Sequence, residues 1–403
     1  MIEGEGLIMA HILVLGAGYG GLRAARDLAK STPAGTQIDL IDKSDKHVEK
    51  TALHTIAAGT NRPDAVSFEI RSVLPSNVNF IKATVSKLDL DNKTVEFSDH
   101  EAIKYDYIVV SLGFRSEDFG LEGASENALI LQDLETAKNI YKKINEHIAN
   151  YKESQDPKDL SIIVCGAGFT GVEILGELVD TVKILKAKYD VPEIKVTCLE
   201  MATRILPMFD ENLASYAVEY LDKNGINLLT GAKIKKIEKQ AVVYMDGDTE
   251  KRVEGSTILW TVGVSGSDVI KSSGIDAKRN RVMTTQFLNL EAHPEAYFIG
   301  DDSAIIPKGE KRPYPTTGQL ATAEGAGAAF NIAAALNGKD LKPFVYKSMG
   351  TVASLGQNHG IAEITGKNLK FKGSVASLLK HLSADRGIME IAGLKTAIRK
   401  GTI

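Results

Sequence analysis

Two glycine-rich segments of the same pattern, at residues 16–21 and 166–171, occur far apart in this chain. Each follows a short apolar run, at 12–15 or 161–165, and each leads into a helical pattern. In this context the first glycine permits a tight turn, the second lets the backbone approach a pyrophosphate, and the third lets helix and strand pack closely. The unpaired N–H groups at each helix start bind phosphates. Two such motifs predict two bound dinucleotides, an arrangement typical of proteins that move electrons between them.

The length and charge of the chain limit the alternatives. At 403 residues it exceeds the roughly 250–300 residues at which one core stops growing, so we expect two or more domains. The 48 basic and 52 acidic residues nearly balance, which gives no overall attraction for nucleic acid.

Neither a membrane-spanning helix nor a secretion signal is expected. Acidic residues such as Glu173 and Glu324 interrupt the longest apolar stretches, which fall short of the roughly 18 residues needed. Glu3 and Glu5 stand where a signal peptide carries basic residues, and Met9 is an alternative start. These features predict a cytoplasmic location.

The apolar patterns predict an α/β protein with two Rossmann-like domains. Expected strands lie at 78–81, 94–97, 105–111, 195–200, 258–261 and 297–299, and expected helices at 211–224 and 317–336. Because the last strand and helix fit the first unit, the second unit would be an insertion. The predicted layout is one domain at 10–115 and 285–340, a second at 116–284, and a C-terminal region at 341–403.

The two cysteines, Cys165 and Cys198, lie in separate apolar runs and form no C-x-x-C pair. We expect them to be buried, inert thiols, with neither a disulfide framework nor a zinc site. Many flavoproteins that bind two dinucleotides pass electrons through a cysteine pair beside the flavin, and this chain lacks such a pair.

Acidic residues close the second strand of each unit. Asp42 is placed to accept hydrogen bonds from adenosine ribose hydroxyls, with Asp39 as its competitor and a plain surface acid as the alternative interpretation. Glu200 occupies the matching position in the second unit, where a carboxylate repels a 2′-phosphate and favours NADH over NADPH. Arg204, close behind it, weakens that preference.

Among the ionisable residues, Glu173 is the strongest candidate for a catalytic role. It follows Gly171 on the helix that starts at the second fingerprint, near where a nicotinamide would approach a flavin. It would hold the nicotinamide or relay a proton. The alternative is that Glu173 only favours the positive end of the helix dipole.

The chain resembles the type II NADH dehydrogenases, single-subunit flavoprotein NADH:quinone oxidoreductases, from His11 nearly to the C-terminus. The resemblance rests on VLGAGY at 14–19, LGF at 112–114, GAGFTGVE at 166–173, ILPMF at 205–209, FIGD at 298–301 and GTVASLG at 350–356. It implies FAD on the first fingerprint, with Asp301 holding the cofactor's phosphate and ribityl region, and NADH on the second.

Together, the motifs and the resemblance define a set of expected cofactor-binding residues. For FAD and NADH together these are Gly16, Gly18, Tyr19, Gly20, Gly21, Asp42, Lys43, Gly113, Asp301, Gly166, Gly168, Phe169, Gly171, Glu200 and Gly263.

One departure from the family concerns the quinone site. The family usually carries Ala-Gln-x-Ala-x-Gln on the helix beside the flavin, whereas this chain keeps Gln319 and has Ala323 in place of the second glutamine. Glu324 is adjacent but about 100° around a helix, so it is not an automatic substitute. The resemblance also points the positive N-terminus of this helix, after Thr317, at the isoalloxazine ring.

The C-terminal region is basic and amphipathic. Apolar residues recur at helical spacing, namely Val375, Leu378, Leu379, Leu382, Ile388, Ile391 and Leu394. This pattern fits either an anionic membrane interface or packing on its own domain or across a dimer, and the resemblance favours the membrane. Lys380 matches a family lysine near the flavin and quinone, although the neighbouring His381 leaves the register open.

The predicted activity is NADH:quinone oxidoreduction without proton pumping. Hydride passes from NADH to FAD, and two electrons then pass to a membrane quinone, with Glu173, Gln319 and Lys380 as catalytic candidates and Ala323 completing the quinone site. We expect menaquinone as acceptor, a homodimer, and peripheral attachment to the cytoplasmic face of the cell membrane. The alternatives are a soluble NADH-dependent flavin reductase that serves a redox protein, free flavin or oxygen, and an NADH-sensing flavoprotein without turnover.

Overall fold

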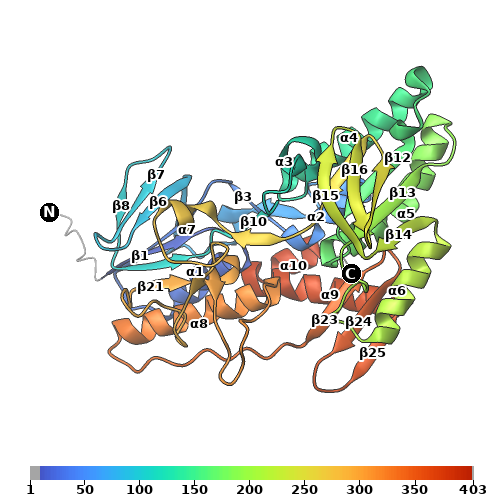
Figure 1. The fold of residues 1–403 in the computed structure, drawn as a ribbon. Coiled ribbons are helices and arrows are strands. Elements are labelled where there is room, and N and C mark those ends of the chain that lie inside the picture. Colours follow the sequence, from blue (N-terminus) through green and yellow to red (C-terminus); the bar gives the residue numbers. More distant parts are fainter. Residues whose placement is uncertain (1–9, 402–403) are drawn as a thin grey trace.

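The structure, a computed structural model, describes residues 10–401, so the alternative start at Met9 lies outside the described residues. Its first unit is built on a five-stranded parallel sheet in the order β21-β9-β1-β2-β5 (Figure 1). Its strands are β1 (Ala10–Leu15), β2 (Thr36–Asp42), β5 (Asn79–Lys82), β9 (Tyr107–Val110) and β21 (Ala296–Phe298). Because β21 pairs with β9, the chain returns to its first sheet after the second unit.

Two helices pack closely on this sheet and on each other. These are α1 (Tyr19–Ser31) and α8 (Gly318–Leu336). A Cβ at Gly325 of α8 would lie 2.3 Å from the carbonyl oxygen of Gly20, so glycine is required where the two helices cross. Val14, Leu22, Leu28 and Ile332 belong to the apolar core that they share with the sheet.

The second unit repeats this plan with a parallel sheet in the order β11-β18-β12-β13-β14. Its strands are β11 (Leu129–Ile130), β12 (Ser161–Cys165), β13 (Lys195–Glu200), β14 (Ile226–Thr230) and β18 (Thr257–Trp260). Its long helices are α4 (Leu134–Ser154), α5 (Phe169–Tyr189) and α6 (Glu211–Lys223). The predicted strands and helices of both units are therefore present, with small shifts at their ends.

Each unit also carries a three-stranded antiparallel sheet. In the first unit the strands are β6 (Val85–Asp89), β7 (Thr94–Phe97) and β8 (Ile103–Lys104). In the second they are β15 (Ala232–Glu238), β16 (Ala241–Asp246) and β17 (Thr249–Glu254). The units are joined by two antiparallel strands, β10 (Phe114–Ser116) and β19 (Val264–Gly266). The shorter elements are β3 (Lys46–Val48), α2 (Leu53–Ala58), β4 (Ser67–Glu69), α3 (Ala124–Asn127), α7 (Asp268–Ser272), β20 (Val282–Met283) and β22 (Ser303–Ala304).

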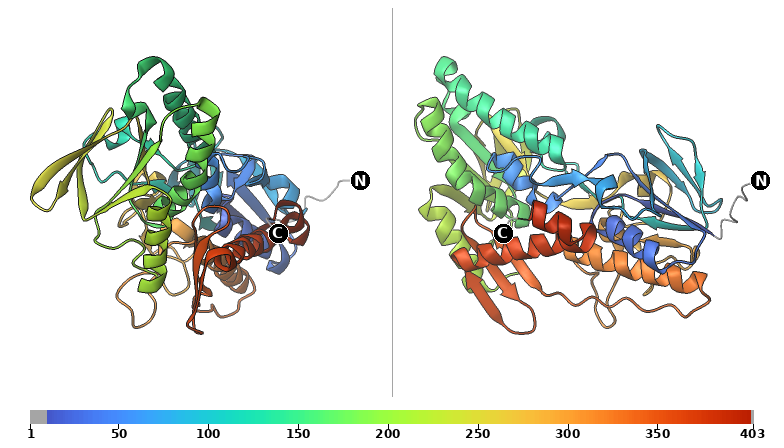
Figure 2. Two further views of the ribbon diagram at one scale, coloured as in Figure 1. Left: turned by 90° about the vertical axis from the view of Figure 1, so that its right-hand side faces the viewer. Right: turned by 180° about the vertical axis from the view of Figure 1, so that it is seen from behind.

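The C-terminal region forms a small sheet followed by two helices. The sheet consists of β23 (Gly350–Ser354), β24 (Gly360–Ile364) and β25 (Leu369–Lys372), and the helices are α9 (Gly373–Ala392) and α10 (Leu394–Lys400). Figure 2 shows α9 running between the two units, from the small sheet at one end to α1 at the other. Residues from the end of the chain therefore reach the space between the units.

The apolar pattern of α9 is not one continuous exposed stripe, which corrects the sequence interpretation. Val375, Leu378 and Leu382 are 50%, 50% and 49% exposed, whereas Ile388 and Ile391 are buried in the core of the first unit. Exposing a buried isoleucine costs about 1.5–3 kcal/mol, so the second half of α9 stays packed on the protein. The second half of α9 therefore fits the alternative of packing on the protein itself, and the first half carries the exposed apolar residues.

Between residues 10 and 401, no helix combines the length and the hydrophobicity needed to cross a bilayer.

Candidate functional site

The two fingerprint loops have the same backbone construction. Gly16 and Gly166 adopt φ values of +94° and +99°, which other residues rarely reach. A Cβ at Gly21 would lie 1.8 Å from the carbonyl oxygen of Gly16, and one at Gly171 would lie 1.9 Å from that of Gly166. Glycine is therefore needed at these positions for the turn and for close helix packing.

The second glycine of each loop has a different environment. Around a Cβ built at Gly18 or at Gly168, no atom of the described chain lies within 4 Å. These glycines are also the N-caps of α1 and α5, and no described side chain caps either helix, whereas Asp133 caps α4 and Thr317 caps α8. Open space next to uncapped N–H groups fits a pyrophosphate, so both loops pass this test for a dinucleotide.

An acid at the strand end is bonded to each loop. Asp42 Oδ2 accepts a hydrogen bond of 2.7 Å from the N–H of Ala17, and Glu200 Oε2 accepts one of 2.7 Å from the N–H of Ala167. Asp39, the competing candidate, is 2% exposed and accepts a hydrogen bond from Gln37 within the protein. The structure therefore places Asp42, and not Asp39, beside the first fingerprint.

Arg204 does not approach the end of β13 as a free cation. Its guanidinium donates to the carbonyl oxygen of Phe209, and Phe209 also packs against Phe169, with 5.6 Å between the ring centroids. A cation engaged in this way is not aimed at a 2′-phosphate beside Glu200.

Buried and partly buried charges lie around the first loop. Burial raises the pKa of Asp301, while Lys50 and Arg281 oppose this effect. Burial likewise lowers the pKa of Lys50, whose Nζ lies 4.7 Å from the ring centroid of Phe114. Asp302 accepts a hydrogen bond of 3.0 Å from the N–H of Gly113, and burial raises its pKa to about 7. The sequence interpretation missed Lys50 and Arg281, because lone basic residues outside any motif carry no signal.

The remaining predicted cofactor residues lie at the edges of these loops. The Tyr19 hydroxyl donates to Glu49 Oε2 at 2.7 Å, and burial raises the pKa of Tyr19. Lys43 is exposed at the end of β2. Gly263 has φ of +73° and lies in the link between β18 and β19.

Glu173 and Lys380, which are distant in sequence, meet in the structure. The Lys380 ammonium lies 2.7 Å from Glu173 Oε1, and this oxygen also accepts hydrogen bonds from the N–H and hydroxyl of Ser354 at 3.0 and 3.1 Å. Burial alone would raise the pKa of Glu173, but Lys380 and His54 outweigh it and hold that pKa below its usual value. Glu173 is therefore an ionised carboxylate paired with Lys380, and Lys380, of the two neighbours Lys380 and His381, is the residue that contacts it.

A glycine on α5 makes this meeting possible. A Cβ at Gly176 would lie 2.4 Å from the backbone nitrogen of Gly356, so the chain after β23 runs directly against the helix. This close approach brings Ser354 onto Glu173 and accounts for the small residues of the segment at 350–356.

Gln319 lies next to the same part of α9. Its amide donates to Ser383 Oγ at 3.3 Å, one helical turn beyond Lys380, and its Oε1 accepts from the Tyr346 hydroxyl at 3.4 Å. Ala323, partly buried, is the next residue on this face of α8. The structure thus places Gln319 against the turn of α9 that follows Lys380.

Glu324 points into the first unit and not toward Gln319. It is fully buried and accepts hydrogen bonds of 2.5 Å from the N–H of Gly300 and 3.2 Å from the Ser303 hydroxyl. Burial raises its pKa to about 8. It therefore does not replace the amide that is missing at Ala323.

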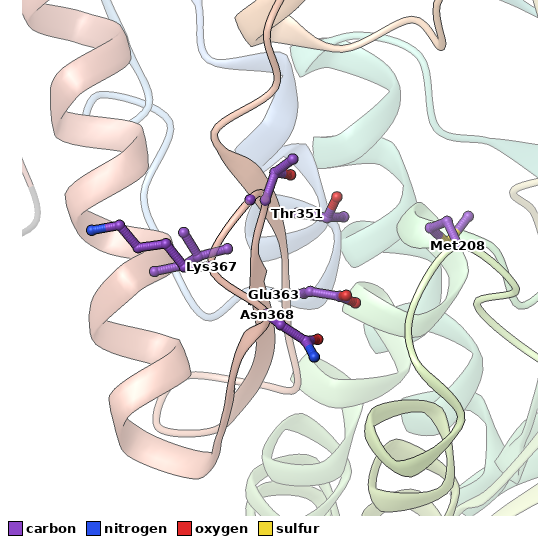
Figure 3. Close-up of a pocket in the computed structure, with 8 residues that line it drawn as sticks. Met208, Thr351, Glu363, Lys367 and Asn368 are labelled. Atoms are coloured by element: carbon purple, nitrogen blue, oxygen red, sulfur yellow. The ribbon is translucent and has the colours of Figure 1, made fainter.

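An open pocket of about 630 Å³ lies between the second unit and the small C-terminal sheet (Figure 3). It is lined by Met208 on one side and by residues of β23, β24 and the β24–β25 turn on the other, among them Thr351 and Glu363. Glu363 accepts a hydrogen bond of 3.3 Å from the N–H of Asp210, which fastens the C-terminal sheet to the second unit.

Comparisons with known proteins agree with this arrangement. Residues 10–326 match the family model of the pyridine nucleotide-disulphide oxidoreductases. The cysteine pair that this name suggests is not found here, because Cys165 and Cys198 are free and buried, as expected.

Curated relatives match over nearly the whole chain. Type II NADH:quinone oxidoreductases of Staphylococcus saprophyticus and Staphylococcus aureus are each 40% identical, over 97% of this chain and 98% of theirs. Among solved structures, NDH2 from Plasmodium falciparum in complex with NADH superposes with a TM-score of 0.84 at 18% identity, covering 97% of both chains. The sulfide:quinone oxidoreductase of Aquifex aeolicus gives 0.77 at 21% identity, over 95% of this chain and 91% of that one. The chain belongs to the type II NADH:quinone oxidoreductases.

Proposed function

We propose that this protein oxidises NADH and reduces a membrane quinone of the menaquinone type, with FAD as the carrier between them. The observation that carries the proposal is that two open, uncapped glycine loops occur in one chain whose second loop leads directly to the Glu173–Lys380 pair. FAD, when bound, accepts a hydride and returns two electrons to an acceptor.

The first loop is the proposed FAD site. Gly18 and the start of α1 would take the pyrophosphate, and Asp42 would take the ribose. Asp301, between Lys50 and Arg281, would fix the phosphate and ribityl region from the other side.

The second loop is the proposed NADH site. Gly168 and the start of α5 would bind the pyrophosphate, and Glu200 would accept from the ribose hydroxyls. A 2′-phosphate would meet the Glu200 carboxylate without help from Arg204, which is engaged with Phe209. We therefore expect NADH to be preferred over NADPH.

The pair formed by Glu173 and Lys380 is the proposed proton-handling group. Lys380 Nζ would donate a proton to the reduced acceptor, and the Glu173 carboxylate, which holds the ammonium in place, would take a proton from water and pass it back to the Lys380 amine. Gln319 of α8, whose amide is bonded to Ser383 one turn beyond Lys380 on α9, would orient a quinone carbonyl, while Ala323 leaves space where the family pattern has a second glutamine.

A variant at Glu173 tests this proposal. Glu173→Gln should slow turnover of NADH with a water-soluble menaquinone analogue by about a hundredfold, because the carboxylate that pairs with Lys380 is lost. FAD content should stay unchanged. Asp180→Asn, on the exposed side of the same helix, is the matched control and should turn over normally. Normal turnover of Glu173→Gln would remove this carboxylate from the reaction.

The first half of α9 is the proposed membrane contact. Val375, Leu378 and Leu382 expose about half of their surfaces on a segment rich in lysine, which suits an anionic lipid interface. We propose attachment at the cytoplasmic face. The homodimer expected from the family resemblance is a separate proposal, which analytical ultracentrifugation of the FAD-loaded protein tests.

Vesicle binding distinguishes this proposal from a soluble reductase. The double variant Leu378→Asp/Leu382→Asp should bind phosphatidylglycerol vesicles at least about tenfold more weakly than the natural protein. NADH oxidation with a water-soluble quinone should be retained. Ile184→Asp, at a 62% exposed position of α5 in the second unit, should bind vesicles normally. Unchanged binding of the double variant would contradict the membrane contact and favour the soluble flavin reductase.

A further inference from the structure

A buried histidine lies against the Glu173–Lys380 pair. His54 belongs to α2, which precedes the second unit in sequence by many residues, yet Leu53, Ile56 and Ala57 of this helix pack in the core of the second unit. The histidine is 5% exposed. An imidazole in such surroundings is costly to bury unless both of its nitrogens have partners.

One imidazole nitrogen of His54 faces Glu173 itself, and the other faces Ser354, which is bonded to Glu173. Nδ1 lies 3.6 Å from Glu173 Oε2, and Nε2 lies 3.4 Å from Ser354 Oγ. The same Ser354 hydroxyl donates to Glu173 Oε1, the oxygen that also binds Lys380. Ser354 of β23, His54 of α2 and Lys380 of α9 thus lie around the two carboxylate oxygens of Glu173.

A second buried carboxylate stands near this histidine. Glu177 follows Glu173 by one helical turn on α5, is 2% exposed, and acts electrostatically on His54. It accepts hydrogen bonds from the Thr60 hydroxyl and from the Gln357 amide, the latter at 2.6 Å, and the Gln357 side chain is exposed. Glu177 therefore adds a second buried carboxylate close enough to act on His54, and its own partner Gln357 is exposed.

The charges around His54 determine its resting state. Burial lowers its pKa, Glu173 and Glu177 oppose this, and Lys380 adds to it, with the net shift downward. The imidazole is neutral near pH 7, so it has a free nitrogen to receive a proton and an N–H to give one. The two carboxylates would stabilise the imidazolium when it forms briefly.

We propose that His54 is a positioning residue that returns protons to Glu173 during reduction of the acceptor. A proton binds one imidazole nitrogen while the other nitrogen releases its proton to Glu173 Oε2, so one N–H bond forms, one breaks, and the imidazole ends neutral. The proton that His54 takes up comes from water, Glu173 passes the proton that it receives on to Lys380, and the electrons come from NADH. This inference rests on the proposed role of Glu173.

The test is reoxidation of the NADH-reduced holoenzyme by a water-soluble menaquinone analogue, followed by stopped flow from about pH 5.5 to about pH 9. His54→Gln keeps hydrogen-bonding groups toward Glu173 and Ser354 but cannot titrate. It should slow reoxidation by about tenfold or more and flatten its pH dependence, while reduction of the flavin by NADH keeps its natural rate. His147→Gln is the control, because His147 is bonded to Thr257 and stands apart from the pair.

The outcomes separate this inference from the proposed function. If Glu173→Gln is slow but His54→Gln reoxidises at the natural rate and with the natural pH profile, the role of His54 is wrong and that of Glu173 stands. If His54→Gln slows both half-reactions equally, its role is only structural and the inference fails. FAD content and thermal unfolding check the fold, and His54→Asn serves as the second variant if His54→Gln does not fold.

Discussion

The two dinucleotide loops share one backbone plan but differ in what surrounds them. The fifth residue of each fingerprint shows this clearly, because Gly20 is buried under α8 in the first unit while Thr170 is exposed in the second. A Cβ at Gly20 would lie 3.0 Å from the carbonyl oxygen of Ala321, so α8 covers the first loop closely. The second loop has no such cover among the described residues.

The charges differ in the same way. Around the first loop Asp302 is buried and Lys50 and Asp301 are partly buried, and desolvation shifts the pKa values of all three. Around the second, Glu200 is partly exposed and Arg204 is engaged with a backbone carbonyl. A loop against which α8 packs, with charges fixed around it, suits a cofactor that stays bound, whereas a loop without this cover suits a substrate that must leave after each turnover.

The largest expected effect comes from placing a side chain in the open space of each loop, which tests whether the two loops bind different dinucleotides. Gly18→Val and Gly168→Val place side chains in open space at φ values of −75° and −73°, so neither should disturb the fold. Gly18→Val should purify without FAD. Gly168→Val should keep FAD but raise the KM for NADH by about tenfold or more, because only the pyrophosphate meets the new side chain. Flavin absorbance and initial rates measure the two effects, and equal FAD loss in both variants would contradict the assignment of the loops.

The next largest effect concerns the acids at the strand ends. Glu200→Gln should raise kcat/KM for NADPH relative to NADH by about tenfold, because the repulsion of a 2′-phosphate is removed. Asp42→Asn, the matched change in the first unit, should weaken FAD retention and leave the NADH to NADPH ratio unchanged. If Asp42→Asn changed the ratio of kcat/KM for NADPH to that for NADH, the nicotinamide dinucleotide would bind the first loop and the assignment of the loops would be wrong.

Removing the cation Lys50 tests the difference in charge between the two loops. Lys50→Met leaves Asp301 with Arg281 alone as its nearby cation, so FAD should dissociate several times faster on dilution, roughly threefold to tenfold. Arg204→Met, in the second unit, should not change FAD release. Release is followed by the rise in free flavin fluorescence, and equal rates in Lys50→Met and the natural protein would show that Lys50 does not support the FAD site.

The smallest expected effect is a change in how stability depends on pH. The folded-state pKa of Glu324, about 8, lies above its unfolded value of about 4.3. The folded protein thus binds a proton that the unfolded chain has lost between about pH 5 and pH 8, and the free energy of unfolding falls as pH rises through that window. Glu324→Gln should reduce this fall, measured by urea unfolding midpoints at about pH 6 and pH 8. Asp302 titrates in the same direction and keeps part of the slope.

Most of the fold could be predicted from local patterns. Glycine spacing, apolar runs and helix signals located both parallel sheets, and Lys195–Glu200 and Thr94–Phe97 were predicted to the residue. The close packing of α8 on α1 could not be predicted from the sequence, because it depends on Gly20 and Gly325 meeting across distant segments. The split of α9 into exposed and buried halves has the same origin, since leucine and isoleucine spacing is alike in both.

The candidate site was predictable only where a motif marked it. Glu173 and Lys380 came from the fingerprint and the resemblance, but no pattern pairs residues that lie so far apart in sequence. His54 and Lys50 were missed because each is an ordinary residue in its own segment, and Ser354 lies in the segment 350–356 that carries the resemblance but was given no role. They become informative only when α2, β23 and the first loop are brought together by the fold.

The most direct test of the account is anaerobic stopped flow with the FAD-loaded protein, mixed with NADH and then with a menaquinone analogue. The account predicts that NADH bleaches the flavin absorbance and that the quinone restores it rapidly, despite Ala323 in place of the usual glutamine. Bleaching without recovery would contradict the assignment of a quinone as the electron acceptor. Absence of bleaching would contradict electron transfer between the two loops altogether.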